Sequence, residues 1–239
     1  METVILCGGM GTRALPLTLE VPKPLLPVGD QPMLRHVMAI YAAQGFDRFV
    51  LAAGYRADLV EAFAAELPAE WSVAVHDTGV DAATGARVRA CRDRVGERFF
   101  VTYGDGVGDV DLGALQRFHD GHDGVVTVTT VALPSPYGTL ELDGDGRVAR
   151  FEEKPSLPEH RINAGFMVVD RAAFDQWDGD DLEREVLPGL AARGSLFAYD
   201  HHGFWRSLDT YKDALELSEL CRDGAPPWLA GGTGCGSLG

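Results

Sequence analysis

The sequence predicts an α/β fold, a doubly wound mixed sheet with an additional, partly antiparallel sheet region. Three observations lead to this fold class. An apolar, β-branched run at residues 3–7 ends in glycines, which is typical of a buried parallel strand. Strand-like and helix-like patterns then alternate up to residue 103, as they do in doubly wound sheets. Between Val125 and Asp170, strand-like runs follow one another with little helix between them.

The elements of the first half follow from local patterns. Prolines at four positions between residues 8 and 29 keep that stretch in loop. An amphipathic pattern predicts a helix at residues 33–44, which Gly45 ends. The same patterns predict a helix at 57–66 and strands at 48–53, 71–75 and 98–103.

The second half is expected to form the far wall of a cleft. The Asp143–Gly146 segment, Asp-Gly-Asp-Gly, is a strong hairpin turn. Short helices are expected near 182–192 and 210–222, and the Gly- and Pro-rich end, 223–239, is predicted to be disordered. The strand-like runs lie at 125–133, 138–142, 147–152 and 163–169.

Composition excludes several classes of function. The 239 residues suit one large domain, and the net charge of −15 argues against a nucleic acid or an anionic membrane as partner. No apolar run reaches the roughly 18 residues of a membrane span. The four cysteines include no CxxC pair, which favours reduced thiols in a cytoplasm over a disulfide framework or a zinc site.

The glycine loop after the first strand is the first candidate site. Residues 9–14 match GxGxxA, so a dinucleotide site of an NAD-dependent oxidoreductase has to be considered. The prolines that follow forbid the helix such a motif opens, and no acidic residue ends the second strand to hold ribose. A plain tight turn remains an alternative for the glycines alone. Arg13 and Lys23, the latter between two prolines, favour a phosphate site.

Two motifs in order carry a family resemblance. The segment VILCGGMGTR, followed by PKPLLPVGDQPMLRH, resembles the sugar nucleotidyltransferases. The resemblance implies a Rossmann-like sheet with a substrate cleft, Mg²⁺ dependence and a homo-oligomer. It implies one domain over residues 1–222, in which 1–110 mainly bind nucleotide and 111–222 mainly bind sugar phosphate. Arg13 and Lys23 would then be catalytic. The residues that would bind nucleotide here are Leu6, Gly8, Gly9, Gly11 and Thr12 at the loop and Gly104 after the fourth predicted strand.

The expected nucleotide is CTP. The pattern DTG…TGAR, followed by YGDGV, is similar to glucose-1-phosphate cytidylyltransferases, where this region borders the base. This chain has Ala86 where that branch has glycine, and it lacks a segment inserted before the DTG. A loop leading to a helix N-cap at Thr84 is the structural alternative. The residues that the resemblance assigns to the nucleotide here are Thr78, Gly79, Thr84, Gly85 and Arg87.

Two aspartates are the expected Mg²⁺ ligands. Asp105 follows a predicted parallel strand at its carboxyl end, where such sheets bind ligands. Asp209 lies in a segment that resembles the family's late Asp-Thr motif, and an N-cap role is its alternative. Mg²⁺ prefers one or two carboxylates together with phosphate oxygens and water.

The sugar phosphate is assigned to three further motifs by resemblance. Read without the family, they are a strand end and bends. The resemblance implies sugar or sugar-phosphate contacts for Tyr137, Gly138, Glu153, Lys154, Asn163 and Gly165.

Glucose 1-phosphate is the expected acceptor. Alternatives are another phosphorylated acceptor, such as a heptose 1-phosphate or a phosphonate or head-group phosphate, and a noncatalytic nucleotide-sugar sensor. Retention of both aspartates and both phosphate-binding cations argues against a sensor.

Overall fold

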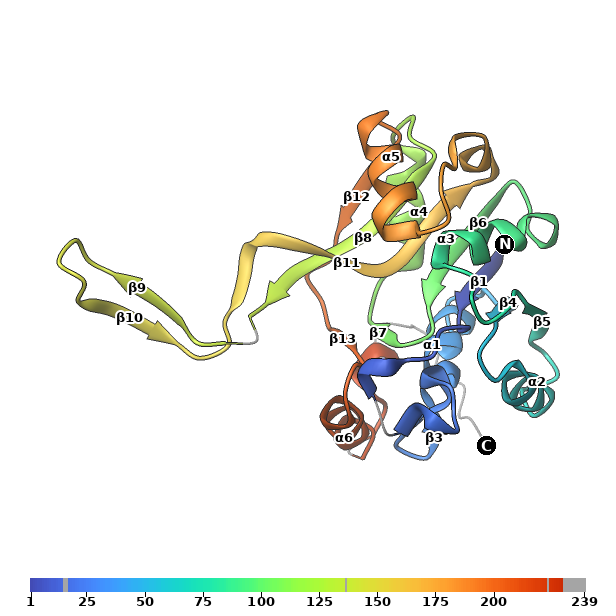
Figure 1. Ribbon diagram of the computed structural model, residues 1–239, viewed down its shortest axis with the longest axis horizontal. Helices are drawn as coiled ribbons and strands as arrows, with labels where there is room; N and C mark the ends of the chain where they lie inside the picture. Colours follow the sequence, from blue (N-terminus) through green and yellow to red (C-terminus); the bar gives the residue numbers. More distant parts are fainter. Residues whose placement is uncertain (15–16, 136, 223, 230–239) are drawn as a thin grey trace.

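The computed structural model describes residues 1–14, 17–135, 137–222 and 224–229, and it centres on a seven-stranded sheet (Figure 1). The order is β12-β8-β11-β6-β1-β4-β5, and every pairing in it is parallel except the two that β11 makes. This confirms the predicted doubly wound mixed sheet. The strands are β1 (Glu2–Leu6), β4 (Arg48–Ala53), β5 (Ser72–Asp77), β6 (Arg98–Tyr103), β8 (Val126–Pro134), β11 (Ser156–Asp170) and β12 (Leu196–Asp200).

Helices cover both faces of the sheet, and each face has its own apolar core. Successive residues of a strand point to opposite faces, so Ile5 packs in one core and Val4 in the other. The Ile5 core includes residues of α1 (Met33–Ala42), α2 (Ala57–Ala65), α4 (Leu112–Asp120) and α6 (Tyr211–Leu220). The Val4 core includes residues of α3 (Thr84–Ala90), α5 (Leu187–Ala192) and the π-helical segment Leu182–Val186.

The carboxyl ends of β1, β4 and β6 meet at one edge of the sheet. The chain leaves β1 toward β4 on one side, while β6 pairs on the other side, and this is a topological switch point. The short strand β7 (Gly106–Gly108) continues from β6 and pairs with β13 (Trp205–Ser207). A bond from Leu208 N to Asp105 O (2.8 Å) extends this ribbon. The β7–β13 ribbon therefore carries the Asp209 segment to the end of β6.

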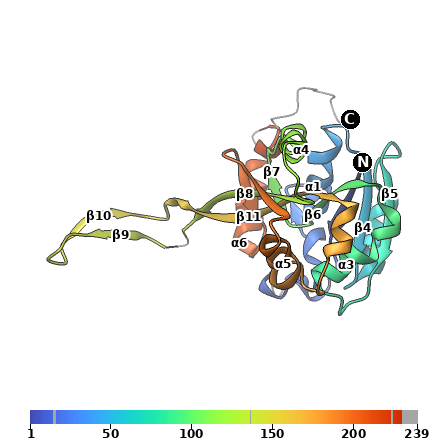
Figure 2. The same cartoon turned by 90° about the horizontal axis from the view of Figure 1, so that it is seen from above.

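An arm projects from this body. The sequence predicted that this hairpin region would form part of the far wall of a cleft, and the structure differs from that prediction. We define the arm as residues 137–155, which contain the antiparallel strands β9 (Thr139–Leu142) and β10 (Val148–Glu152). Figures 1 and 2 show it extending outward beyond the paired ends of β8 and β11. The hairpin turn at 143–146 lies at its tip, as predicted, but the hairpin does not form a wall of the cavity described below.

The chain end is more structured than its composition indicates. Residues 223–239 were expected to be disordered, yet Pro227–Leu229 form a 3₁₀ turn that buries Trp228 to 2% exposure. The rings of Trp228 and His36 form a T-shaped contact, with their centroids 5.4 Å apart. One large aromatic side chain thus anchors residues 224–229, whereas 223 and 230–239 lie outside the described residues. In the described part of the chain, no helix is long and apolar enough to cross a membrane.

Two histidines, the buried His119 and the half-buried His122, link α4 to the sheet far from the strand ends described above. The Gly124 N–H donates to His122 Nδ1 (3.1 Å), so the proton of this imidazole is on Nε2, which donates to Thr127 Oγ1 (2.7 Å). The Thr127 hydroxyl can then donate to His119 Nδ1 (2.8 Å). His119 Nε2 lies 3.2 Å from Asp170, which also binds Arg98. Both imidazoles are neutral in this arrangement.

The free energy of unfolding should therefore fall as the pH drops below about 6.5, the ordinary histidine pKa. Burial lowers the pKa of both His119 and His122, so the unfolded chain takes up protons first as the pH decreases. Urea unfolding at pH 7.5 and 5.5 measures this loss. A His119→Asn/His122→Asn variant should lose less stability between the two pH values than wild type. The exposed His202→Asn control should keep the wild-type difference; equal differences in all three proteins would contradict the account.

Candidate active site

A cavity of about 820 Å³ opens at the carboxyl ends of the parallel strands. This volume suits a small-molecule ligand. Gly11 has a φ of +62°, and a β-carbon there would approach Lys23 Cβ to 2.7 Å, so the loop needs glycine at this position. The backbone of Arg13 lies in a 3₁₀ turn, Thr12–Ala14, but its side chain lies outside the described part of the structure. Leu6, Gly8, Gly9, Gly11 and Thr12, which the resemblance assigned to the nucleotide, all line the cavity.

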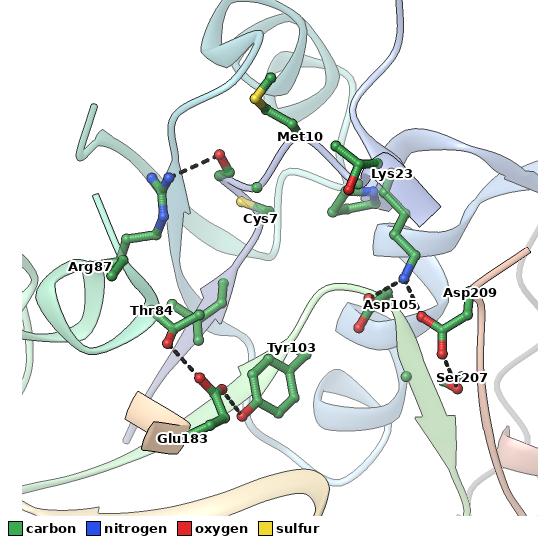
Figure 3. A pocket seen from close by; sticks show the side chains of 18 of the residues that line it. Cys7, Met10, Lys23, Thr84, Arg87, Tyr103, Asp105, Glu183, Ser207 and Asp209 are labelled. Carbon is green, nitrogen blue, oxygen red and sulfur yellow. Dashed lines mark hydrogen bonds and ion pairs between the residues drawn. The ribbon is translucent and has the colours of Figure 1, made fainter. Parts of the chain in front are cut away.

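Lys23 joins the two aspartates that the sequence nominated as metal ligands (Figure 3). Its ammonium nitrogen lies 2.7 Å from Asp105 Oδ2 and 2.7 Å from Asp209 Oδ1, and its side chain is only 7% exposed. Two of the three ammonium donors are thus bound by carboxylates. Asp209 is not the N-cap of α6, because Thr210 holds that position in a capping box with Asp213.

The two carboxylates provide a donor set suited to Mg²⁺. They are hard oxygen ligands that already converge on one cationic centre at the cavity edge. The described residues contain no group of three or more Asp, Glu, His or Cys side chains that could enclose a metal. A site of two aspartates therefore needs other ligands, and phosphate oxygens and water are those that Mg²⁺ usually takes.

Arg87 organises the wall of the cavity on the nucleotide side. The residue is 3% exposed. Its guanidinium donates to the carbonyls of Ala53, Gly79, Gly8 and Val80 over 2.8–3.0 Å, and to Thr78 Oγ1 at 2.5 Å. Burial lowers the pKa of this guanidinium, and five acceptors surround its two terminal nitrogens. The resemblance assigned Arg87 to nucleotide binding; it lines the cavity, and both of its terminal nitrogens donate to the protein itself. Arg87 therefore fixes the glycine loop to the segment after β5.

The other glycines assigned to the nucleotide have structural contacts of their own. A β-carbon on Gly85 would lie 2.8 Å from Asp180 O, so this glycine lets α3 approach the 180–182 backbone. A β-carbon on Gly104 would lie 3.0 Å from the Pro24 side chain, so this glycine lets the end of β6 approach the segment that carries Lys23. Of the residues predicted in this region, Thr84 and Arg87 line the cavity, together with Val80, Ala82 and Ala83.

The sequence missed a hydrogen-bonded chain that crosses the cavity. Thr84 starts α3, after Ala83 in the N-cap position, and its hydroxyl donates to Glu183 Oε2 at 2.7 Å. Tyr103 OH donates to Glu183 Oε1, and Asn163 Nδ2 lies 3.4 Å from Tyr103 OH (Figure 3 shows the first three side chains). Burial, and then the Glu183 charge, raise the pKa of Tyr103. This series of hydrogen bonds connects Thr84, in the region predicted to border the base, with Asn163, which was predicted to contact the sugar.

Residues predicted for the sugar phosphate separate into two groups. Asn163 lines the cavity, and Gly165, with a φ of +84°, packs against the Tyr103 ring and donates its N–H to Asn163 Oδ1 (2.9 Å). The other four lie on the arm and are absent from the described cavity lining. Lys154 is exposed and has a φ of 49°. These four residues are Tyr137, Gly138, Glu153 and Lys154.

The charge of the cavity is unusual for a site that would hold phosphates. Its described lining contains four carboxylates and two cations, Lys23 and Arg87. Cys7 also lines it, but burial raises the pKa of this thiol to about 12, so it is no thiolate nucleophile at neutral pH. An anionic ligand therefore requires further positive charge from outside this lining. The four carboxylates belong to Asp105, Asp181, Glu183 and Asp209.

Residues 2–223 match the protein family described as nucleotidyl transferase. The chain belongs to this family. It is 35% identical to the glucose-1-phosphate cytidylyltransferase of Salmonella typhi, over 95% of this chain and 98% of that protein. It is 32% identical to the mannose-1-phosphate guanylyltransferase catalytic subunit beta of Xenopus tropicalis, over 98% of this chain and 69% of that protein.

A solved structure extends the similarity to the fold. HddC from Yersinia pseudotuberculosis superposes with a TM-score of 0.72 at 23% identity, over 91% of this chain and 98% of that one. At this identity the likeness concerns the fold alone. Family membership and fold agree with the resemblance that the two motifs carry.

Proposed function

We propose that this member of the family transfers a cytidylyl group from CTP to glucose 1-phosphate, giving CDP-glucose and pyrophosphate. The observation that carries the proposal is the convergence of Lys23, Asp105 and Asp209 beside a glycine loop on one cavity. A cation between two carboxylates, next to bare backbone N–H groups, suits a triphosphate with its metal.

The reaction needs no general base, because the sugar phosphate is already an anion. One of its oxygens attacks the α-phosphorus of the nucleotide in line, and the bond from that phosphorus to the β-phosphate oxygen breaks. Catalysis is then positioning and charge neutralisation. The loop N–H groups and Arg13 bind the β- and γ-phosphates, and Lys23 contacts the triphosphate. Mg²⁺, held by Asp105 and Asp209, would neutralise charge on the phosphates.

The choice of CTP rests on the segment from Thr78 to Arg87 and on the relatives. Val80, Ala82 and Ala83 line the cavity, and backbone amide groups of this segment can be presented to a base edge. The Salmonella typhi cytidylyltransferase is 35% identical over 98% of its length, and the Xenopus tropicalis guanylyltransferase is 32% identical over 69% of its length. These numbers favour CTP and make GTP with mannose 1-phosphate the first competitor.

A substrate matrix tests the base and the acceptor together. Five nucleoside triphosphates are combined with glucose, mannose and heptose 1-phosphates and with a phosphonate, and pyrophosphate release is measured. The highest kcat/KM is expected for CTP with glucose 1-phosphate. A higher value for GTP with mannose 1-phosphate, or for another acceptor, would reassign the substrates. No turnover with any pair, together with nucleotide-sugar binding, would favour a sensor.

Arg13→Ala should lower kcat by roughly 10²–10³-fold, the cost of removing one preorganised donor from developing charge. The leaving pyrophosphate gains charge as its bond to the α-phosphorus breaks, and the guanidinium fork suits two of its oxygens. Steady-state kinetics with the best substrate pair measure the change. An Arg13→Ala enzyme with wild-type kcat would remove Arg13 from the mechanism.

A further inference from the structure

One short segment between β4 and α2 holds the glycine loop at both of its ends. The Tyr55 N–H donates to Gly8 O at 3.0 Å, where the loop begins. The Tyr55 hydroxyl donates to Leu19 O at 2.6 Å, and the Arg56 guanidinium donates to Glu20 O at 2.7 Å. Two consecutive residues therefore bind both ends of a stretch that starts at Gly8 and ends at Glu20. We call Tyr55 and Arg56 the anchor pair.

The backbone at Arg56 is strained. Its φ is 50°, in the left-handed region, and the residue occupies the N-cap position of α2 without a side-chain cap bond. Asp58, in the first turn of α2, binds the guanidinium through both carboxylate oxygens, at 3.0 and 3.1 Å. Strain of this kind persists only where surrounding contacts enforce it, and it is concentrated at functional sites. At Arg56 the strained residue directs its guanidinium to the Glu20 carbonyl.

Bonds inside the loop connect the anchor pair to the Thr12–Ala14 turn. Thr18 is 2% exposed, and its carbonyl lies 3.2 Å from the Tyr55 hydroxyl. The Thr18 hydroxyl donates to Gly11 O at 3.0 Å, and Gly11 O also accepts the Ala14 N–H at 2.9 Å. The turn thus lies between Gly11 and Thr18, which are bonded to each other and, through Thr18, to the anchor pair.

The tip of the loop lacks close packing that could fix its position instead. In the described structure, a β-carbon on Gly9 would meet no atom within 4 Å beyond its chain neighbours, and Met10 is 50% exposed. Backbone N–H groups bind phosphate best when they are held in place beforehand, because ordering them during binding costs conformational entropy. The position of the loop donors therefore depends on the bonds at the loop ends.

We propose that Tyr55 and Arg56 are positioning residues, which hold the glycine loop and the Thr12–Ala14 turn in place for the triphosphate. Neither residue belongs to the described cavity lining, so they act through the carbonyls that they bind. Their part in catalysis rests on the proposed function, in which Arg13 and the loop N–H groups bind the β- and γ-phosphates. The anchoring of the loop does not rest on it.

Limited proteolysis tests the anchoring without any substrate. Trypsin cleaves after arginine, and Arg13 is the first arginine or lysine of the chain. Tyr55→Phe removes one hydroxyl, and Arg56→Gly removes the guanidinium at a φ of 50° that glycine adopts readily, so the double variant should fold. Its cleavage after Arg13 should be roughly tenfold faster than in wild type, because lost hydrogen bonds raise the population of the open loop. Cleavage after Arg147, at the tip of the arm, should be unchanged.

Steady-state kinetics test the positioning. The double variant should lower kcat/KM for the nucleotide by roughly 10–100-fold, the cost of slightly misplaced binding groups, and leave the KM of the sugar phosphate within about twofold. Partial unfolding alone would not separate the two substrates in this way. In an Arg13→Ala background the same changes should cost only a few fold, because they act through the turn that Arg13 occupies. The control Tyr211→Phe changes a tyrosine that is 59% exposed and should keep wild-type kinetics.

Unchanged cleavage after Arg13 in the double variant would overturn the anchoring. Faster cleavage with unchanged kcat/KM, or equal losses in the wild-type and Arg13→Ala backgrounds, would overturn the positioning role. A wild-type protein without turnover on any substrate pair would instead contradict the proposed function, and the cleavage rates would then decide the anchoring alone.

Discussion

Lys23→Ala should lower kcat/KM by roughly 10²–10³-fold, because it removes a charge that pairs with both aspartates and, in the proposed mechanism, contacts the triphosphate. In the structure Lys23 Nζ lies 2.7 Å from Asp105 and 2.7 Å from Asp209, almost wholly shielded from solvent. Without it the two carboxylates lose the cation that they share in the structure. Steady-state pyrophosphate release measures the loss, and a thermal melt of the same samples checks that the variant folds.

The chain provides its own control for this substitution. It contains three lysines, at positions 23, 154 and 212. Lys212 is 71% exposed and pairs with Glu216 on the surface of α6, so Lys212→Ala should keep wild-type kinetics. A Lys23→Ala enzyme that folds and retains kcat/KM within a few fold of Lys212→Ala would contradict the role given to Lys23.

Arg87→Met should lower the free energy of unfolding by about 2–4 kcal/mol, because it removes five hydrogen bonds that join a buried side chain to three separate segments. Gly8 O and Ala53 O keep bonds from Tyr55 N and Thr78 N, but no other donor is seen for Gly79 O or Val80 O among the described bonds. The segment after β5 should then lose its fixed position against the glycine loop, and KM for the nucleotide should rise. Urea unfolding and steady-state kinetics measure the two effects.

Arg89→Met is the matched control, two residues further along α3. Arg89 pairs with Asp180 at the surface with its side chain 45% exposed, and removing it should cost less than about 1 kcal/mol. Equal losses in the two variants would mean that the Arg87 bonds contribute little to folding.

Local patterns predicted the regular elements well. Strands β4 and β6 have the bounds that the sequence predicted, and α1 begins at the predicted residue, because each is a short run with a clear period and a clear stop. Helix α4 and strand β12 were missed. Helix α4 is cut short after nine residues and has a wide polar face, and β12 has only five residues.

The site required contacts that no local pattern contains. Asp105 and Asp209 were both nominated from the sequence, but the β7–β13 ribbon that brings them together pairs segments about a hundred residues apart. Glu183 and Tyr103 were missed because a glutamate in a polar stretch and an aromatic residue at a strand end give no signal alone. Arg87 was found, but its role depends on carbonyls from three other segments.

The position of Lys154 shows the limit of motif reasoning most clearly. The motif predicted a sugar-phosphate residue, and the structure places it at the base of an exposed hairpin, away from Asn163. Eight residues separate Lys154 from Asn163 in the sequence. A segment of this length could either turn back toward the cavity or continue as an extended strand. Pairing of β8 with β11 up to Ser156 decides for the extended strand.

The most direct test of the central claim is ³¹P NMR of wild-type protein with CTP, glucose 1-phosphate and Mg²⁺. If a sugar-phosphate oxygen attacks the α-phosphorus, the phosphate monoester signal should disappear. Two coupled diphosphate signals should replace it, with pyrophosphate in equal amount. Appearance of inorganic phosphate or CMP beside unchanged glucose 1-phosphate would instead show hydrolysis of the nucleotide, and would contradict nucleotidyl transfer to this acceptor.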